Sequence, residues 1–236
     1  MITPYYEDRN VTLYHGDCRE ILPQIEASDV VITDPPYSDW VHEHSRGGEK
    51  GGGSKPRDLG FEPLDPELRL RVALEIARIV RRWVLVFSDV ESRHLWREDL
   101  LKPGLEYVRT GAWVKIGSAP QFTGDRPAAG FEEIAIAHPP GRKRWNGGGS
   151  AALWSVPIVP HATRWHPTEK PLGLMKRLVS DFSEPGELIL DPFCGSGSTL
   201  RACKDLGRRA IGIEAKEEWC AIAVRRLAQE TLALGM

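Results

Sequence analysis

An acid, two prolines and an aromatic ring stand together at Asp34, Pro35, Pro36 and Tyr37. They follow an apolar run, 29–33, that is typical of a buried parallel strand. Because paired prolines cannot continue a sheet ladder, the strand should end where the carboxylate begins, at the edge where open α/β sheets bind ligands. The carboxylate and a main-chain carbonyl could accept both N–H bonds of a planar amine while the ring stacks on its face. An ordinary Pro-Pro turn whose Asp caps a helix is the alternative.

A second polar cluster follows the strand expected at 187–190. It begins at Asp191 and continues through Phe193 and Cys194 into the glycine-rich run Gly195, Ser196, Gly197, Ser198 and Thr199. A strand, a glycine-rich turn and a helix form the plan of nucleotide-cofactor sites. However, Leu200 stands where the third glycine of a dinucleotide motif would be, and the lysine of a phosphate loop is missing. We therefore expect this loop to hold something other than a pyrophosphate.

Two further acids end expected strands. Glu214 follows the strand at 209–213, where an acid is the standard acceptor for ribose hydroxyls, although a carboxylate at the start of the helix at 216–232 is the alternative. Asp17 follows the strand at 11–14 and precedes a helical turn at 18–22, so it lies at a strand end and could also be a plain N-cap. Together with Asp34 and Asp191, these acids are expected along one sheet edge.

Two glycine-rich segments carry concentrated positive charge. The segment 38–60 holds Arg46, Lys50, Lys55 and Arg57 and has few apolar residues, which indicates a mobile lid over something anionic or a solvated linker. In the segment 139–165, Trp145 follows three consecutive basic residues, Arg142, Lys143 and Arg144. Such a cluster can contact phosphates and stack on bases, although a solvated loop is the more frequent case. Four histidines (His42, His44, His161 and His166) lack a ligand spacing, so no metal is expected.

Alternation of apolar runs defines the elements that must position these residues. Helices are expected from Pro66 to about Arg82 and from Pro171 onward, and a buried strand is expected at 83–87. Strands at 112–115 and 133–137 should form an antiparallel hairpin at the sheet edge. The sequence therefore predicts an α/β protein, residues 1–236 in one domain, with a mostly parallel twisted sheet.

Composition excludes several classes of protein. The 236 residues are 41% hydrophobic and 27% charged, with a net charge of −2, so any nucleic-acid surface must be local. The four cysteines are scattered, which indicates neither a zinc site nor a disulfide framework and fits a reducing cytoplasm. We expect no signal peptide and no membrane span, because no apolar run reaches the necessary length.

The motifs, in this order, resemble those of the DNA amino-methyltransferases that use S-adenosylmethionine. The resemblance spans almost the whole chain and rests on 34–37, 191–199 and the run from His166 to Pro171. Weaker similarities lie at Gly16-Asp17 and at Trp113, Lys115, Arg126, Pro127 and Glu132. The catalytic turn precedes the cofactor loop, as in the permuted β group of this family. The resemblance implies a Rossmann-like methyltransferase fold with a circularly permuted motif order.

The resemblance also implies roles for individual residues. Asp191, Phe193 and the loop 195–199 would surround the methionine end of S-adenosylmethionine, and Thr168 and Lys170 would approach its carboxylate. Glu214 would accept from the ribose, while Asp17 and Cys18 would face the adenine. Asp34 and the Pro35 carbonyl would bind the amino group of a base flipped out of double-stranded DNA, with Tyr37 stacked on that base. The loop 38–60 and the cluster 142–145 would hold the DNA, and the short segment 139–165 would be the target-recognition segment.

Several alternatives remain open at this level. Asp at the head of the catalytic turn favours adenine N6 over cytosine N4, where Ser is more common in the family. A catalytically idle domain that binds cofactor or DNA, or an enzyme acting on RNA or on protein side-chain amides, would share some of these motifs. The resemblance also leaves open a homodimer and a matching restriction endonuclease.

Overall fold

The computed structural model describes residues 2–36, 65–120, 124–166 and 168–229. Within these ranges the strands are β1 (Tyr6–Glu7), β2 (Val11–His15), β3 (Val30–Thr33), β4 (Val84–Ser88), β5 (Glu106–Ile116), β6 (Phe131–His138), β7 (Leu153–Pro157), β8 (Leu188–Asp191) and β9 (Arg209–Glu214). The α-helices are α1 (Cys18–Ile21), α3 (Pro66–Ile79), α4 (Arg93–Leu101), α5 (Leu172–Phe182), α6 (Ser198–Asp205) and α7 (Glu217–Ala228). Short 3-10 helices lie at Leu22–Gln24 and His161–Thr163.

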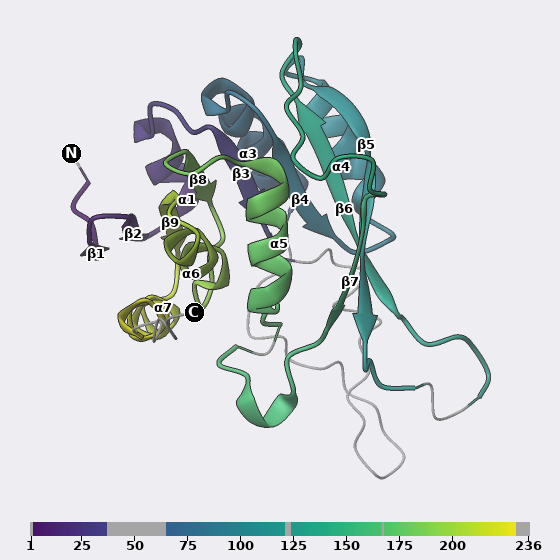
Figure 1. The fold of residues 1–236 in the computed structure, drawn as a ribbon. Coiled ribbons are helices and arrows are strands. Elements are labelled where there is room, and N and C mark those ends of the chain that lie inside the picture. The colour runs from purple at the N-terminus through teal and green to yellow at the C-terminus, as the bar shows by residue number, and fades with distance from the viewer. Residues whose placement is uncertain (1, 37–64, 121–123, 167, 230–236) are drawn as a thin grey trace.

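The described strands form one mixed sheet in the order β1-β2-β9-β8-β3-β4-β6-β5-β7 (Figure 1). The five central strands, from β2 to β4, all run parallel. From β3 the chain moves to β4 in one direction, and from β8 it moves to β9 in the other, so the order reverses between β3 and β8. Ligands bind at such a switch point in open α/β sheets. We call the side of the sheet formed by the carboxyl ends of these five strands the front edge, and the side formed by their amino ends the rear edge. Neither name refers to the outermost strands of the sheet.

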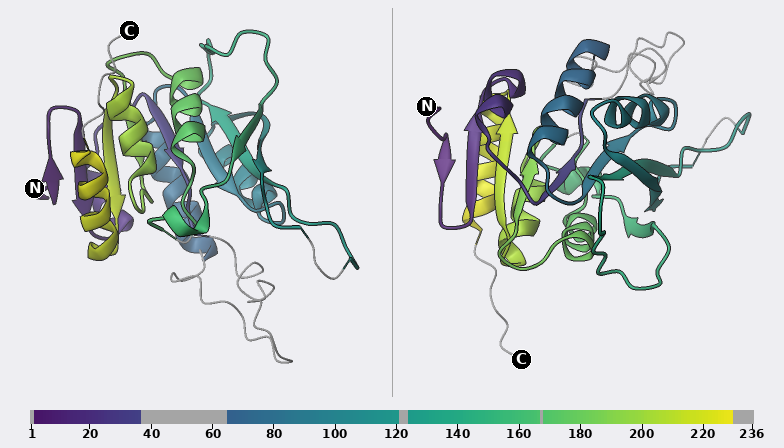
Figure 2. Two further views of the ribbon diagram at one scale, coloured as in Figure 1. Left: turned by 60° about the horizontal axis from the view of Figure 1, so that its bottom comes forward. Right: turned by 90° about the horizontal axis from the view of Figure 1, so that it is seen from above.

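Helices cover both faces of the sheet, which confirms the expected α/β fold (Figure 2). Buried side chains of α1, α3 and α4 pack with Val31, Val84 and Val86 on one face of the sheet. On the other face, α5 and α6 pack with Ile32, Leu85 and Ile189. Adjacent strand residues thus enter opposite cores, as the alternation of side chains along a strand requires, and a strand buried on both faces reads as an unbroken apolar run.

Local signals set the start of α3. The Asp65 side chain accepts a hydrogen bond from the Leu68 amide at 2.8 Å, and Pro66 occupies the first helical turn. Both features satisfy or remove amides that the helix leaves unpaired at its start. In the described ranges, every helix is too short or too polar to cross a membrane.

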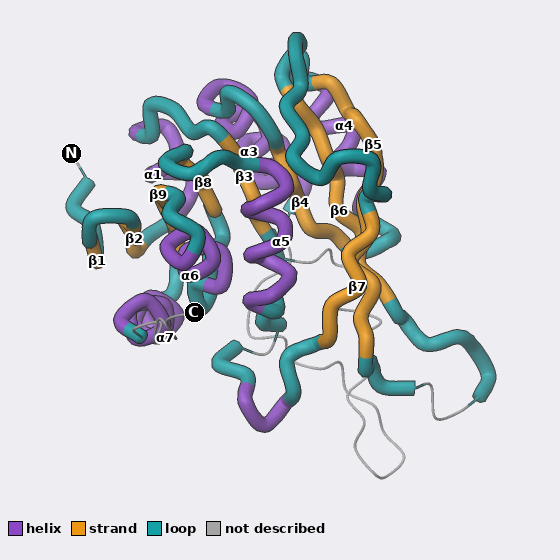
Figure 3. Tube along the Cα trace, viewed as in Figure 1, coloured by secondary structure: helices purple, strands orange, loops and turns teal. Residues whose placement is uncertain are grey.

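The hairpin prediction needs one correction. Strands β5 and β6 do pair antiparallel, but β7 pairs in parallel with the other side of β5, so the hairpin is not the sheet edge. Figure 3 shows β5, β6 and β7 grouped on one side of the molecule. In addition, β5 begins at Glu106 rather than at residue 112. Strand β7 lies inside the segment 139–165, where glycines, prolines and basic residues hide its five-residue pattern. Its Trp154 is buried, and the indole donates to the Asp181 carboxylate at 3.0 Å.

Candidate active site

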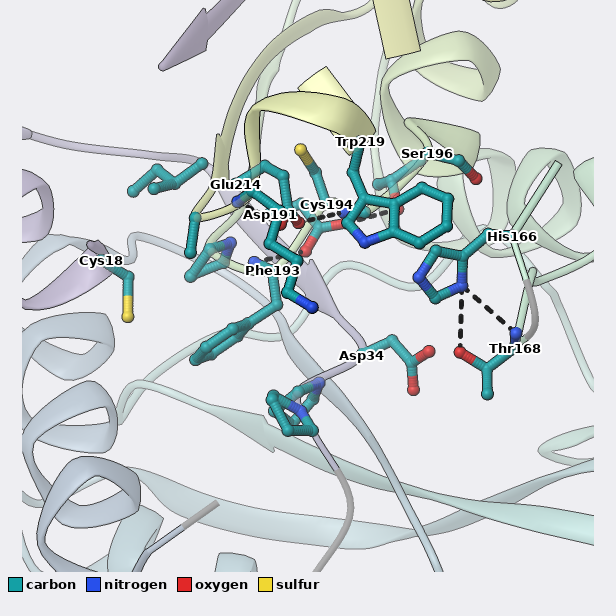
Figure 4. A pocket seen from close by; sticks show the side chains of 18 of the residues that line it. Cys18, Asp34, His166, Thr168, Asp191, Phe193, Cys194, Ser196, Glu214 and Trp219 are labelled. Carbon is teal, nitrogen blue, oxygen red and sulfur yellow. Dashed lines mark hydrogen bonds between the residues drawn. The ribbon is translucent and has the colours of Figure 1, made fainter. Parts of the chain in front are cut away.

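Four acids gather at the front edge because four neighbouring parallel strands end there. Asp17 follows β2, Glu214 and Asp191 end β9 and β8, and Asp34 follows β3. All four line a cavity of about 480 Å³, a size typical of small-molecule sites. Its wall contains most of the sequence-predicted site residues: Asp17, Cys18, Asp34, Pro35, Pro36, Thr168, Lys170, Asp191, Phe193, Gly195, Ser196, Ser198, Thr199 and Glu214. Cys18 lies at one end and His166 and Thr168 at the other (Figure 4).

The glycine-rich turn is shaped by its left-handed backbone and by Glu214. Gly197, directly before α6, has a φ of +79°, and a Cβ there would lie 2.9 Å from the Cβ of Ala223 on α7. Only glycine meets both the conformation and the close packing without strain. Gly195 donates its amide to Glu214 at 3.0 Å, and Glu214 also accepts from the Lys216 amide at 2.8 Å. Glu214 thus ties the turn to the end of β9 while it lines the cavity.

Asp191 is a buried carboxyl group in the middle of the cavity wall. It accepts from the Thr199 hydroxyl at 2.6 Å and from the Phe193 amide at 3.2 Å. Burial raises its pKa to about 7, and these hydrogen bonds offset part of the rise. Among the described residues it makes no ion pair, so a bound cation would stabilise its charged form.

Asp34 lies beside Asp191's strand and is held by a cation. Its Oδ2 pairs with the ammonium of Lys170, whereas its Oδ1 is buried and has no hydrogen-bond partner among the described residues. Burial raises the pKa of Asp34, and the Lys170 charge opposes the rise. Tyr37, the expected stacking ring, lies outside the described residues. The acid and the two prolines of the predicted turn therefore reach the cavity.

His166 and the residues from Thr168 to Lys170 line the cavity next to α7. The imidazole of His166 meets the Trp219 indole edge-on at 4.2 Å between ring centroids, and Thr168 contacts the His166 Nδ1 at 3.2 Å (Figure 4). Burial lowers the pKa of His166 to about 4, so its ring is neutral near pH 7. Arg226 of α7 donates to Glu169 at 2.8 Å. These contacts fix Thr168 and Lys170 against the cavity.

Asp17 is the N-cap of α1 and also lines the cavity. Its carboxylate caps α1 by accepting from the Arg19 amide at 2.8 Å, and it pairs with the Arg19 side chain. These contacts, led by the Arg19 side chain, lower the pKa of Asp17. At the same time Asp17 and Cys18 line the cavity, at the end near α3. Capping therefore does not remove Asp17 from the site.

The basic cluster 142–144 does not reach the cavity. Because β6 runs antiparallel to β4, the segment that follows β6 lies at the rear edge. There Lys143 pairs with Glu106, Arg144 lies 3.6 Å from Glu184, and the Arg144 carbonyl accepts from Trp83. The expectation that Arg142, Lys143 and Arg144 hold DNA at the site is therefore not supported by their position. The other predicted DNA contacts, Arg46, Lys50, Lys55 and Arg57, lie outside the described residues.

Some residues of the site carried no usable sequence signal. Glu132 and Lys115 join the Lys170 contact from β6 and β5, and Trp219 reaches the cavity from α7. Lys115 and Glu132 appeared only as weak family similarities, and a single tryptophan on a helix predicts nothing. Within the described residues, no group of three or more His, Cys, Asp or Glu side chains could hold a metal ion.

Comparisons with known proteins agree on one family. A family model described as DNA methylase matches residues 28–225. The putative methylase YubD of Escherichia coli K12 is 48% identical over 223 residues, covering 90% of this chain and 88% of that protein. The type II methyltransferase M2.DpnII of Streptococcus pneumoniae is 26% identical over 260 residues, covering 98% and 94% of the two chains. The solved M1.HpyAVI–SAM complex superposes with a TM-score of 0.73 at 26% identity, covering 93% of this chain and 100% of the other.

Proposed function

This chain belongs to the N6/N4 family of DNA methylases, and from that premise we propose that it transfers a methyl group from S-adenosylmethionine to the exocyclic amino group of a base flipped out of DNA. The observation that carries the proposal is the meeting of two motifs at one cavity: Asp34 with its prolines, and the turn from Asp191 to Thr199. They are separated by more than 150 residues in the sequence, and both end strands at the switch point.

The cavity suits S-adenosylmethionine on the chemistry of its walls. Asp191 is a buried carboxyl group without a cation among the described residues, which suits the amino group of the cofactor. Glu214 and Asp17 offer carboxylate acceptors for the ribose hydroxyls and the adenine amino group, and Phe193 offers an apolar face. The 480 Å³ volume falls in the range of cofactor-sized sites. The cofactor supplies a methyl group on a sulfonium, an electrophile that needs no metal.

Asp34 and Pro35 would activate the base by accepting its two N–H bonds. The lone pair of an exocyclic amine is delocalised into the base ring, which makes the nitrogen a poor nucleophile. Two fixed acceptors localise that lone pair, and the Asp34 charge stabilises the positive charge that develops on nitrogen. The buried Oδ1 of Asp34 supports this role, because no hydrogen-bond partner holds it among the described residues.

We propose adenine N6 as the target, with cytosine N4 as the alternative. Support comes from Asp34 at the head of the turn, where the family more often has Ser in cytosine enzymes. A base within duplex DNA cannot enter a cavity at the edge of a sheet, so flipping is part of the proposal, at a cost of a few kcal/mol. The loop 38–60 stays a prediction for holding the distorted strand.

The product of the reaction tests the proposal. Unmodified genomic DNA is incubated with the protein and methyl-labelled cofactor, digested to nucleosides and analysed by mass spectrometry. We expect label in N6-methyladenine and none with Asp34→Ala, which serves as the inactive control. Label in N4-methylcytosine would change the target base from adenine to cytosine and leave the rest of the proposal unchanged. No label in any DNA nucleoside, or faster labelling of RNA or protein competitors, would refute the proposal.

A further inference from the structure

A chain of four alternating charges ends at Asp34. Lys115 on β5 lies 2.6 Å from Glu132 on β6, and Glu132 lies 3.1 Å from Lys170, which in turn pairs with Asp34. The four residues come from four separate parts of the chain. Lys170 and Glu132 are 5% and 10% exposed, so both charges depend on each other rather than on water.

Lys170 makes the two oxygens of the Asp34 carboxylate unequal. Its ammonium takes Oδ2, and among the described residues Oδ1 has no hydrogen-bond partner. The Lys170 ammonium also lies 5.0 Å from the centroid of the Phe87 ring, on β4, which limits its movement. With one oxygen fixed, the carboxylate cannot rotate freely, and the second oxygen keeps one direction.

We infer that Lys170, itself held by Glu132, is a positioning residue for Asp34: it fixes Oδ2 and leaves Oδ1 to accept an N–H from the substrate amine. The inference rests on the proposed function and deepens it. It also changes the role expected for Lys170, from a contact of the cofactor carboxylate to a partner of the catalytic acid.

The charges around Asp34 give the inference a directional signature. Lys170 and, more weakly, Lys115 lower the pKa of Asp34, whereas Glu132 raises it. Asp191, across the switch point, is a further acid that interacts with Asp34. Removal of the Lys170 charge should therefore raise the Asp34 pKa, and removal of the Glu132 charge should lower it. A role limited to packing would not produce two opposite shifts.

The experiment follows Asp34 itself by carbon-13 NMR of labelled aspartate carboxyl groups. Asp34→Asn identifies its resonance, and the titration is repeated in Lys170→Gln and Glu132→Gln. Lys102→Gln is the matched control, because Lys102 also pairs with a buried aspartate, Asp99, at 2.7 Å, but at the end of α4. The same variants are assayed for the pH dependence of kcat and for binding of S-adenosylhomocysteine by calorimetry.

We expect the Asp34 titration and the acid limb of kcat to move to higher pH in Lys170→Gln and to lower pH in Glu132→Gln. They should stay in place in Lys102→Gln. At pH 7, kcat of Lys170→Gln should fall about tenfold or more, because a misplaced acceptor loses alignment. Binding of S-adenosylhomocysteine should change less than kcat does.

Three outcomes would overturn the inference: shifts in the same direction, no shift, or a Lys170→Gln variant whose only defect is weaker binding of S-adenosylhomocysteine. If Lys170→Gln does not fold, the direction in which the Asp34 pKa shifts in Glu132→Gln still tests the inference: a shift to lower pH supports it, and any other result overturns it. The NMR titration needs no activity. A protein that shows both shifts but never methylates DNA would therefore refute the proposed function and leave the positioning contact standing.

Discussion

Both edges of the parallel strands carry many charged side chains, but the two sets are organised differently. At the front edge, Asp34, Asp191 and Glu214 are drawn into one cavity, and burial raises the pKa of each. At the rear edge, Arg82 pairs with Glu187, Lys143 with Glu106 and Arg144 with Glu184. Asp191 and the Oδ1 of Asp34 therefore keep binding capacity for a ligand, although Lys170 holds the Oδ2 of Asp34, whereas the rear-edge charges pair with one another.

The difference teaches that the place of a charge in the topology matters more than its density in the sequence. The run 142–144 is the densest basic cluster among the described residues, yet β6 delivers it to the rear edge. The acids of the front edge are isolated in the sequence. They meet because parallel strands all end on the same side.

The largest expected effect comes from the front edge. Asp34→Ala should lower kcat by about 10²-fold or more, as loss of a preorganised charge-stabilising group does. Binding of S-adenosylhomocysteine should stay close to that of the wild type, because the glycine-rich turn is intact. Single-turnover methylation and calorimetry measure the two effects separately. Undiminished transfer would contradict the role assigned to Asp34.

The second effect concerns Asp191 and pH. A carboxyl group with a pKa of about 7 gains its charge as the pH rises through 7, so an ammonium ligand should bind more tightly at pH 8 than at pH 6. Affinity for S-adenosylhomocysteine should change by close to tenfold per pH unit well below 7 and level off above it. Asp191→Asn should bind more weakly and lose this dependence. A flat wild-type profile by calorimetry would contradict the cationic contact.

A smaller effect compares two glycines, one at each edge. Gly197 in the front turn has a φ of +79° and Gly186 at the rear has +82°, but only at Gly197 would a Cβ meet another atom within 4 Å. Alanine should cost about 1–2 kcal/mol at either position through backbone strain. Gly197→Ala should cost more, because α7 must move away from the new methyl group. Thermal unfolding of the two variants measures the difference, and equal Tm values would show that the front turn is not tightly packed.

The smallest effect is expected at the rear edge. Reversal of charge in Arg142→Glu with Lys143→Glu should leave the affinity for duplex DNA and its salt dependence nearly unchanged, since these residues lie away from the cavity. Reversal of Lys50 and Lys55 in the predicted lid is the matched comparison and should weaken binding and reduce the salt slope. A loss of DNA affinity in the rear variant alone would mean that DNA extends around the sheet.

Local sequence patterns predict where the strands end and where the glycine-rich turn lies. The apolar runs 30–33, 188–190 and 209–213 are each followed by an acid, and this pattern alone predicts Asp34, Asp191 and Glu214 at one edge of the sheet. The turn before α6 is likewise predicted by a glycine-rich run between a strand and a helix, although the left-handed conformation of Gly197 is seen only in the structure.

Local sequence patterns do not predict contacts between distant parts of the chain. Lys170 and Asp34 are 136 residues apart, and neither residue type indicates that the two pair. Strand β7 was missed because five residues within a glycine- and tryptophan-containing segment give little periodicity. The position of the basic cluster could have been predicted: an antiparallel β6 must release the following residues at the rear edge.

The most direct measurement is a structure of the protein with S-adenosylhomocysteine and a duplex containing its target sequence. We predict one base flipped into the cavity, its exocyclic nitrogen within hydrogen-bond distance of the Asp34 carboxylate and the Pro35 carbonyl, with the cofactor sulfur facing that nitrogen. A base that stays stacked in the duplex, or a cofactor bound away from the turn 191–199, would contradict the account.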